Sequence, residues 1–146
     1  MGRIVVGGLS RSVNSAGSGD FGIARFTATG QLDTSFAATG TTIFDFGGHD
    51  DVPSDVLLQP SGKIIVAGHV WPTTAAARDF GAVRFNYDGS LDTTFGDGGK
   101  MIADVYGVDY SRGSVLQFDP LCACEKLVMS GGDGPYTTFA RFSTLP

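Results

Sequence analysis

The residues best suited to bind a metal ion lie in the stretch FNYDGSLDTTFGDGGK, residues 85–100. Asn86, Asp88, Asp92 and Asp97 place several side-chain oxygens in one glycine-bearing loop, and calcium takes six to eight oxygen ligands. The spacing differs from the EF-hand pattern, which ends with a distant bidentate glutamate. The stretch is therefore either a calcium loop of another kind or a structural turn.

An earlier copy of this stretch favours the structural turn. Residues 20–26 (DFGIARF) match 79–85 (DFGAVRF), and residues 30–36 (GQLDTSF) match 89–95 (GSLDTTF), both at a spacing of 59 residues. Possible ligands are lost in the first copy, where Thr27, Thr29 and Ala38 replace Asn86, Asp88 and Asp97. This comparison disfavours a calcium site, and we expect no metal or cofactor.

The residues that both copies keep are those of a turn with hydrophobic anchors. Glycine accepts a positive φ, aspartate bonds to backbone N–H groups two residues on, and phenylalanine anchors the loop against the sheet. The turn residues expected from this pattern are Gly30, Asp33 and Phe36 in the first copy and Gly89, Asp92 and Phe95 in the second.

Three arginines recur at the end of one expected strand, each directly before a phenylalanine: Arg25, Arg84 and Arg141. One interpretation is a row of arginines that binds a ligand. The structural alternative is favoured, because buried charges must be paired. That alternative pairs Arg25 with Asp33 or Asp20, and Arg84 with Asp92 or Asp79.

Two further segments are not shared by the copies. Trp71 lies in the loop 69–78 and could stack on a sugar, although packing beneath the loop is favoured because tryptophan contributes mostly by burial. The segment His49-Asp50-Asp51 is expected to be a solvated loop and not a catalytic or metal site. The chain has no recognised motif for a catalytic nucleophile or a phosphate-binding loop, so we expect no enzyme activity.

Cys122 and Cys124 are the only cysteines, and they lie in an insertion of the second copy. Structural or incidental thiols are the favoured interpretation, because a disulfide across one residue closes a tight ring of unusual geometry. A disulfide or redox pair is the second alternative. Metal binding is the third, since two thiolates without further cysteine or histidine make a poor zinc site.

Composition disfavours several broad classes of protein. The formal net charge is −5, so the chain lacks the basic patch of a nucleic-acid-binding protein. Apolar runs such as residues 64–67 are far shorter than the roughly 20 residues that cross a bilayer, so no membrane insertion is expected. The first residues show no secretory signal.

The elements that must position these residues are short strands. Apolar segments of the second copy, separated by Gly, Pro, Asp, Ser and Thr, lie at residues 63–68, 79–86, 99–105 and 114–119. Helices need longer amphipathic windows, and none is expected. Four antiparallel strands per repeat form the unit of a β-propeller blade.

The repeat resembles a known family, the delta-sixty repeat. Residues 79–100 match its Asp-Phe strand ending in Arg-Phe, its Asp-Gly-Ser-Leu-Asp-Thr-Thr-Phe-Gly run and its Gly-Gly-Lys, and residues 58–68 match its hairpin, with Ser61 in place of an aspartate. The resemblance implies an uncharacterised bacterial β-propeller repeat, often found in long secreted or surface proteins. It implies an extracellular or cell-surface location and brings no established catalytic residues.

We therefore expect an all-β protein of antiparallel four-stranded units, with one repeat domain over residues 1–146. The units span residues 2–61, 62–124 and, in part, 125–146, or about two and a half blades. Closed propellers have four to eight blades, so we expect self-association or flanking repeats of a longer chain. The expected function is a non-catalytic structural or binding module for protein or glycan; the alternative is a carbohydrate-active or other hydrolytic propeller fragment.

Overall fold

The computed structural model describes residues 2–11, 18–47, 49–72, 78–105, 107–133 and 135–145. These residues form ten strands and no helix, and so contain no helix that could cross a membrane. The strands are β1 (Ile4–Arg11), β2 (Gly19–Phe26), β3 (Thr41–Phe44), β4 (Val52–Leu58), β5 (Ile64–Val70), β6 (Asp79–Phe85), β7 (Lys100–Ala103), β8 (Ser111–Asp119), β9 (Cys124–Gly131) and β10 (Thr138–Ser143).

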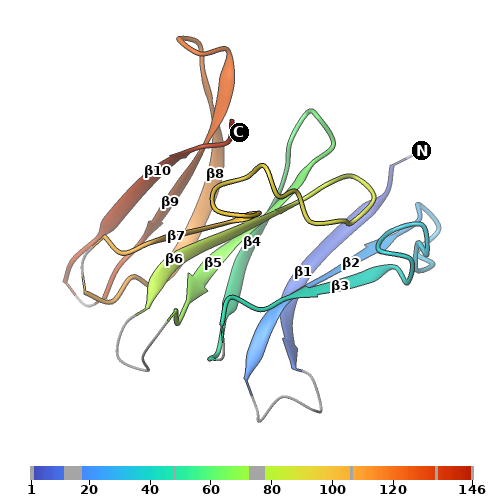
Figure 1. Cartoon of the computed structure of the whole chain (residues 1–146), viewed down its shortest axis with the longest axis horizontal. Helices are drawn as coiled ribbons and strands as arrows, with labels where there is room; N and C mark the ends of the chain where they lie inside the picture. Colours follow the sequence, from blue (N-terminus) through green and yellow to red (C-terminus); the bar gives the residue numbers. More distant parts are fainter. Residues whose placement is uncertain are drawn as a thin grey trace.

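The strands form three antiparallel sheets that stand beside one another like blades (Figure 1). The first sheet has the order β1-β2-β3, the second β4-β5-β6-β7 and the third β10-β9-β8. Register places Ile4 of β1 beside Phe26 of β2, and Ile64 of β5 beside Phe85 of β6, which are matching positions of the two copies. The expected all-β class with antiparallel repeat units is confirmed.

The second and third sheets each draw on two of the sequence units. Strand β4 ends before residue 62 but pairs with β5, and β8 ends before residue 125 but pairs with β9. Matching β1 with β5 shows that the described part of the first sheet has no counterpart of β4. In the same way, the described part of the third sheet has no counterpart of β7. The sheets are therefore out of phase with the sequence units, with a complete four-stranded sheet in the middle.

Two hydrophobic layers lie between the sheets. The rear face of the second sheet, defined here by Ile64, Val66, Val83 and Phe85, packs on Phe21 and Ile23 of the first sheet. Its forward face, defined by Ile65, Ala67, Phe80 and Ala82, packs on Leu127 and Met129 of the third sheet. Because both faces of β5 and β6 are covered, apolar residues stand on both faces of these strands, and β6 also carries the buried charges of Asp79 and Arg84.

Glycines allow the sheets to approach closely at matching points. A Cβ at Gly68 would lie 2.8 Å from Cζ of Phe21, and a Cβ at Gly131 would lie 2.9 Å from Cε1 of Phe80. Real Cβ atoms essentially never come that close to another atom. The phenylalanine that begins the Asp-Phe strand of each copy therefore packs on a glycine of the next sheet.

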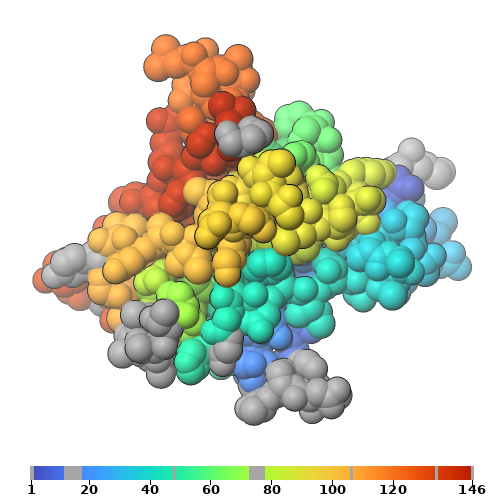
Figure 2. Space-filling view, viewed as in Figure 1, coloured from blue at the N-terminus to red at the C-terminus, as the bar shows by residue number. Residues whose placement is uncertain are grey.

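The turns after β2 and β6 also meet across the first interface. The backbone N–H of Ala37 donates a hydrogen bond to the carbonyl of Asp88 at 2.7 Å. The ring of Phe36 lies directly against Gly89, whose φ is +87°. Figure 2 shows the yellow turn segment lying against the cyan segment of the first sheet. Polar backbone contacts thus extend the hydrophobic layer at its edge.

Candidate functional site

Each of the first two sheets holds one arginine in a buried ion pair. Nε of Arg25 lies 2.9 Å from Oδ2 of Asp33, and Nε of Arg84 lies 2.6 Å from Oδ2 of Asp92. Both arginines are only 2% exposed. This is the geometry of the structural interpretation, and the sequence alternatives Asp20 and Asp79 are not the ion-pair partners.

Each arginine also joins its sheet to the next one. The Nη1 group of Arg25 donates a hydrogen bond to the carbonyl of Tyr87, and that of Arg84 donates to the carbonyl of Thr144. Tyr87 follows β6 and Thr144 follows β10, so both acceptors belong to the neighbouring sheet. We call each arginine, its aspartate and this carbonyl an interblade clamp.

Aromatic rings and second cations complete the clamps. The guanidinium carbon lies 4.8 Å from the ring centre of Phe36 in the first clamp and 4.7 Å from that of Phe95 in the second. Arg3 adds a second ion pair to Asp33, and Lys63 adds one to Asp92, each at 2.6 Å. Arg3 and Lys63 occupy matching positions in the two copies, so the repeat could have indicated these second ion pairs. Our sequence prediction did not include them.

The hydrogen bonds of the clamps keep their aspartates ionised. Hydrogen bonding from Ser35 is the largest influence on Asp33 and, with Arg3 and Arg25, holds its pKa well below the ordinary value. Burial pushes the pKa of Asp92 upward, but hydrogen bonds from Lys63 and Thr94 outweigh burial and leave it well below the ordinary value.

The other expected turn residues surround these aspartates. Oδ1 of Asp33 accepts the N–H and hydroxyl of Ser35, and Oδ1 of Asp92 accepts those of Thr94. Gly30 adopts a φ of +82°, like Gly89 in the second copy. The structure thus forms an aspartate-capped turn in both copies.

In the stretch first considered for calcium, side chains bond to groups of the same turn. Oδ1 of Asp88 accepts the backbone N–H of Ser90 at 3.0 Å and its hydroxyl at 2.7 Å. The amide of Asn86 donates to the hydroxyl of Ser90 at 3.0 Å. These side chains therefore close the turn on itself.

Arg141, the third arginine of the row, has a different setting. Its Nη2 group lies 2.8 Å from Oδ2 of Asp119, and its side chain is 50% exposed. Phe139, two residues earlier on the same face of β10, is 67% exposed. The structure therefore separates Arg141 from Arg25 and Arg84, which are buried between sheets.

Trp71 packs against groups of its own chain. The guanidinium of Arg78 lies over its ring, with 4.0 Å between the carbon and the ring centre, and the same guanidinium lies 4.4 Å from the ring centre of Tyr110. Trp71 and Arg78 line a hollow together with His49 and Asp50. Residues 73–77 of the loop in which we placed Trp71 lie outside the described residues.

In each of the two copies, three carboxyl groups gather near the start of the Asp-Phe strand, β2 or β6. The first set is Asp20, Asp45 and Asp51, and the second is Asp79, Asp104 and Asp109. In each set, one oxygen from each residue lies within 4.8 Å of the others. We call these sets the first and second aspartate clusters.

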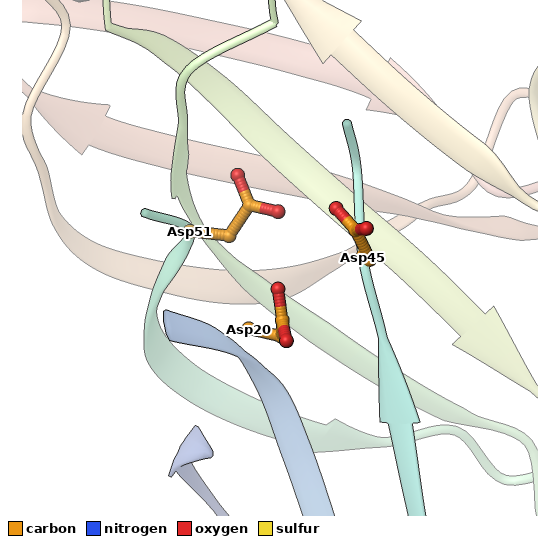
Figure 3. A group of neighbouring side chains, drawn as sticks. All are labelled: Asp20, Asp45 and Asp51. Atoms are coloured by element: carbon orange, nitrogen blue, oxygen red, sulfur yellow. The ribbon is translucent and has the colours of Figure 1, made fainter. Parts of the chain in front are cut away.

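Figure 3 shows how the first cluster is assembled. Asp20 lies at the start of β2, Asp45 directly follows β3, and Asp51 directly precedes β4, and the three carboxyl groups turn toward a common space. Asp51 is held by the backbone N–H of Phe46, which donates to Oδ2 at 2.8 Å. Asp109 accepts the matching bond from Val105 at 2.7 Å.

The solvated-loop interpretation is wrong for Asp51. Asp51 is 0% exposed, and its carboxyl group accepts the backbone N–H groups of Phe46 and Trp71. His49 is exposed as expected, while Asp50 accepts the backbone N–H of Gly19 at 2.6 Å. The sequence signal that could have revealed the cluster is the match of Asp51 to Asp109, which is hidden because their spacing is 58 residues and not 59.

The clusters oppose ionisation of their own carboxyl groups. Burial raises the pKa of Asp51 to about 6, against hydrogen bonds from Phe46 and Trp71 and together with the charges of Asp45 and Asp20. Burial, followed by the charges of Asp104 and Asp109, raises the pKa of Asp79. Such a group of carboxylates can hold a proton or a hard cation.

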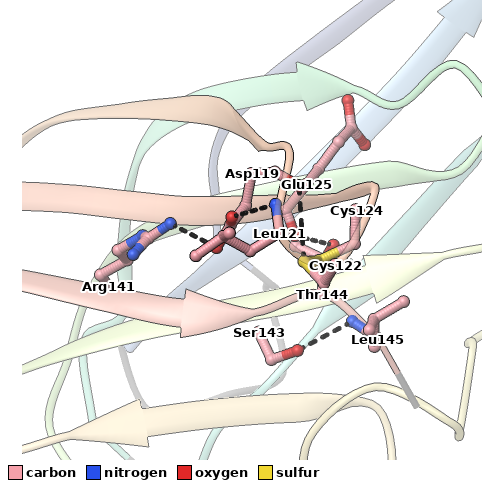
Figure 4. Close-up of a disulfide and its surroundings, with 9 residues drawn as sticks. All are labelled: Asp119, Leu121, Cys122, Cys124, Glu125, Arg141, Ser143, Thr144 and Leu145. Atoms are coloured by element: carbon pink, nitrogen blue, oxygen red, sulfur yellow. Dashed lines mark hydrogen bonds and ion pairs between the residues drawn. A yellow bond between two sulfur atoms is a disulfide. The ribbon is translucent and has the colours of Figure 1, made fainter.

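The two cysteines form a disulfide in the hairpin between β8 and β9, as Figure 4 shows. The thiol interpretation is therefore wrong, and the second alternative holds. The intervening Ala123 adopts a left-handed φ of +50°, which brings the cysteines to a Cα–Cα distance of 5.1 Å. Redox exchange, zinc binding and other thiol chemistry would require this bond to open.

Comparison with known proteins finds one family that two segments of the chain resemble. Residues 2–36 and 59–95 match a family model described as a domain of unknown function (DUF5122) beta-propeller. No curated protein and no solved structure gives a significant match. The matched segments contain β1, β2, β5 and β6 with both aspartate-capped turns. The matched segments are thus similar to an uncharacterised β-propeller family, and the three antiparallel sheets beside one another have the architecture of an incomplete β-propeller.

Proposed function

We propose that the chain is a non-catalytic structural module of delta-sixty repeats that assembles head to tail with a second copy of itself. The observation that carries this proposal is that one blade-to-blade interface is built twice within the chain. Sequence positions that match its two halves lie on the outer faces of the first and third sheets. A bacterial secreted or surface assembly is the setting that the family resemblance suggests.

The outer face of the first sheet matches the rear face of the second. Ile4 and Val6 correspond to Ile64 and Val66, which are buried against the first sheet. In this chain Ile4 is 51% exposed and Val6 is 49% exposed. Val6 lines a hollow of about 370 Å³ with other residues of this face, including Gly8, Ala24 and Ile43. An open apolar face of this kind is typical of an interaction surface.

The outer face of the third sheet matches the forward face of the second. Phe139 corresponds to Ala82, and Arg141 corresponds to Arg84 of the second clamp. Phe139 is 67% exposed, and Val115 on the same face is 58% exposed. The third sheet therefore presents a protruding apolar residue. The face of the first sheet that would receive it from a second copy is hollowed.

A second copy fits both faces because the partner surfaces are those already joined inside the chain. Arg25 and Arg84 donate to the carbonyls of Tyr87 and Thr144. The residue of the first copy that matches these two acceptors is Ala28, so Ala28 of a second copy is the expected acceptor for Arg141. Arg141 would then leave Asp119 and donate to the carbonyl of Ala28 of the second copy. Two copies together bring six sheets whose strands amount to about five four-stranded blades, within the range of four to eight blades of closed propellers.

The test is the mass of the purified chain in solution, measured by light scattering during size-exclusion chromatography. We expect twice the mass of one chain. Val6→Arg and Phe139→Arg should each give monomers, because each places a charge in both interfaces of the ring. Leu121→Arg is the matched control, since Leu121 is 97% exposed in the disulfide hairpin.

Mixing the two monomeric variants separates this interface from other modes of association. A Val6→Arg copy keeps an intact third sheet, and a Phe139→Arg copy keeps an intact first sheet, so the mixture should form an open dimer. A symmetric dimer that uses one face twice would not be restored by mixing. A monomeric wild-type chain would overturn the proposal.

A hydrolytic propeller is the alternative function. It needs a single acid–base pair of carboxyl groups, whereas the aspartate clusters recur in both copies. This recurrence supports a role repeated with the fold. Glycan binding without turnover on an array would agree with a non-catalytic module, and hydrolysis lost on replacement of one aspartate would favour the enzyme.

A further inference from the structure

We propose that each aspartate cluster binds one divalent cation of the calcium class, which ties neighbouring sheets together at their crossover. The site differs from the turn at residues 85–100, where the carboxylates bond to their own loop. It also differs from the proposed association faces, because the clusters lie at the strand ends.

The first argument is the kind of ligand and its spacing. Three carboxylate oxygens within 4.8 Å of one another, from residues on separate elements, present the hard oxygen donors that calcium prefers. The same set occurs in both copies, although the connecting loops differ by one residue in length. The arrangement is thus kept where the local chain length changes.

A second observation points to a missing ligand in the second cluster. Oδ1 of Asp79 is buried and has no hydrogen-bond partner among the described residues, and Asp79 as a whole is only 7% exposed. No ion pair within the described residues includes Asp79. Burying a carboxylate oxygen without a donor is costly, and a bound cation removes this cost.

Backbone N–H groups orient the carboxylates of both clusters. The backbone N–H of Val105 fixes Oδ2 of Asp109, as that of Phe46 fixes Oδ2 of Asp51. Backbone carbonyls and water can supply the rest of a six- to eight-ligand sphere around the three carboxylates. Calcium suits such a site better than magnesium, which demands near-ideal octahedral geometry.

The position of each cluster gives the cation a structural task. Asp79 and Asp104 belong to the second sheet, whereas Asp109 directly precedes β8 of the third. In the first cluster, Asp51 directly precedes β4 of the second sheet. A cation in either cluster would therefore join two sheets at the end opposite to the interblade clamps.

The experiment is calorimetric titration of the whole, chelator-treated chain with calcium chloride. The wild-type chain should bind two ions, and calcium should raise its unfolding temperature because it binds only the folded state. Asp79→Asn should bind one ion, and a double variant with Asp20→Asn should bind none. Asp97→Asn is the matched control, because this exposed aspartate lies outside both clusters and should leave two ions bound.

Loss of binding through misfolding is separable from loss of a ligand. Without calcium, Asp79→Asn should unfold at a temperature no lower than the wild type, because the substitution removes charge repulsion among carboxylates. The monomeric Val6→Arg variant should still bind two ions, so this test is independent of the proposed assembly. Absence of calcium binding by the wild-type chain, or preference for magnesium, would overturn the proposal.

Discussion

Asp92 and Asp79 belong to the same repeat and are both nearly buried, but they stand at opposite ends of β6 in opposite surroundings. Asp92 accepts hydrogen bonds from Arg84 and Lys63, and its pKa is lowered. Asp79 faces Asp104 and Asp109, and its pKa is raised. The comparison teaches that aspartate conserved between two copies of one chain can serve unrelated physical roles.

The two ends therefore contribute differently to stability. At the clamp end, several donors satisfy each buried carboxylate. The arginine also donates a hydrogen bond to a carbonyl of the next sheet. The cluster end concentrates like charges whose cost depends on protons or cations in solution. One end holds the blades together under all ordinary conditions, and the other responds to the solvent.

Breaking the second clamp should have the largest effect. Arg84→Met removes the buried partner of Asp92 and should lower the free energy of unfolding by about 3–5 kcal/mol. Arg141→Met is the matched control, and its exposed pair with Asp119 should contribute less than about 1 kcal/mol. Urea denaturation measures both. Equal losses would contradict the distinction between the buried and exposed arginines.

Lowering the pH should change the contributions of the two ends to the free energy of unfolding in opposite directions. In metal-free buffer the folded pKa of Asp51, about 6, exceeds the unfolded value of about 4, so the free energy of unfolding should rise as the pH falls from 7 toward 4. This gain is up to about 3 kcal/mol for Asp51. Asp51→Asn should flatten the rise.

Below a pH of about 4 the clamps should dominate. The pKa values of Asp33 and Asp92 are lowered by folding, so their stabilisation is present above the unfolded pKa and is lost as the pH falls below it. Thermal unfolding across the pH range should show a maximum on the acidic side of neutrality. Stability that declines steadily from pH 7 downward would refute the assignment of the clusters.

Removing the disulfide should have the smallest effect. The ring between Cys122 and Cys124 is short, so Cys122→Ser with Cys124→Ser should lower the free energy of unfolding by only about 1–2 kcal/mol. The hairpin lies near the second clamp, because the hydroxyl of Thr144 donates to the carbonyl of Glu125 at 2.6 Å. A loss as large as that of Arg84→Met would mean that the hairpin supports this clamp.

Much of the fold could be predicted because the sequence contains two copies of one repeat that can be compared with each other. The apolar runs at β5 and β6 and the retained turn residues Asp33 and Asp92 predicted strands and turns directly. The cluster partner of Asp20 and Asp45 could not be assigned in the same way. Asp51 reaches them across a change of sheet, and its copy Asp109 is displaced by one residue.

Other outcomes depended on local conformation that residue types do not determine. Ala123 takes a left-handed φ that a non-glycine residue rarely adopts, and this geometry accompanies the close approach of the flanking cysteines. For Arg84, both Asp79 and Asp92 were acceptable by residue type. The turn after β6 decides between them by folding Asp92 back over the end of the strand.

The offset between sheets and sequence units has a consequence for how such chains can grow and be divided. Duplicating a unit such as residues 62–124 adds strands that must complete the sheet before it and begin the sheet after it. New blades are therefore interlocked with their neighbours by covalent connection from the moment they arise. A cut after residue 61 would separate β4 from β5, whereas cuts near residues 50 and 107 would preserve the central sheet as a transferable building block.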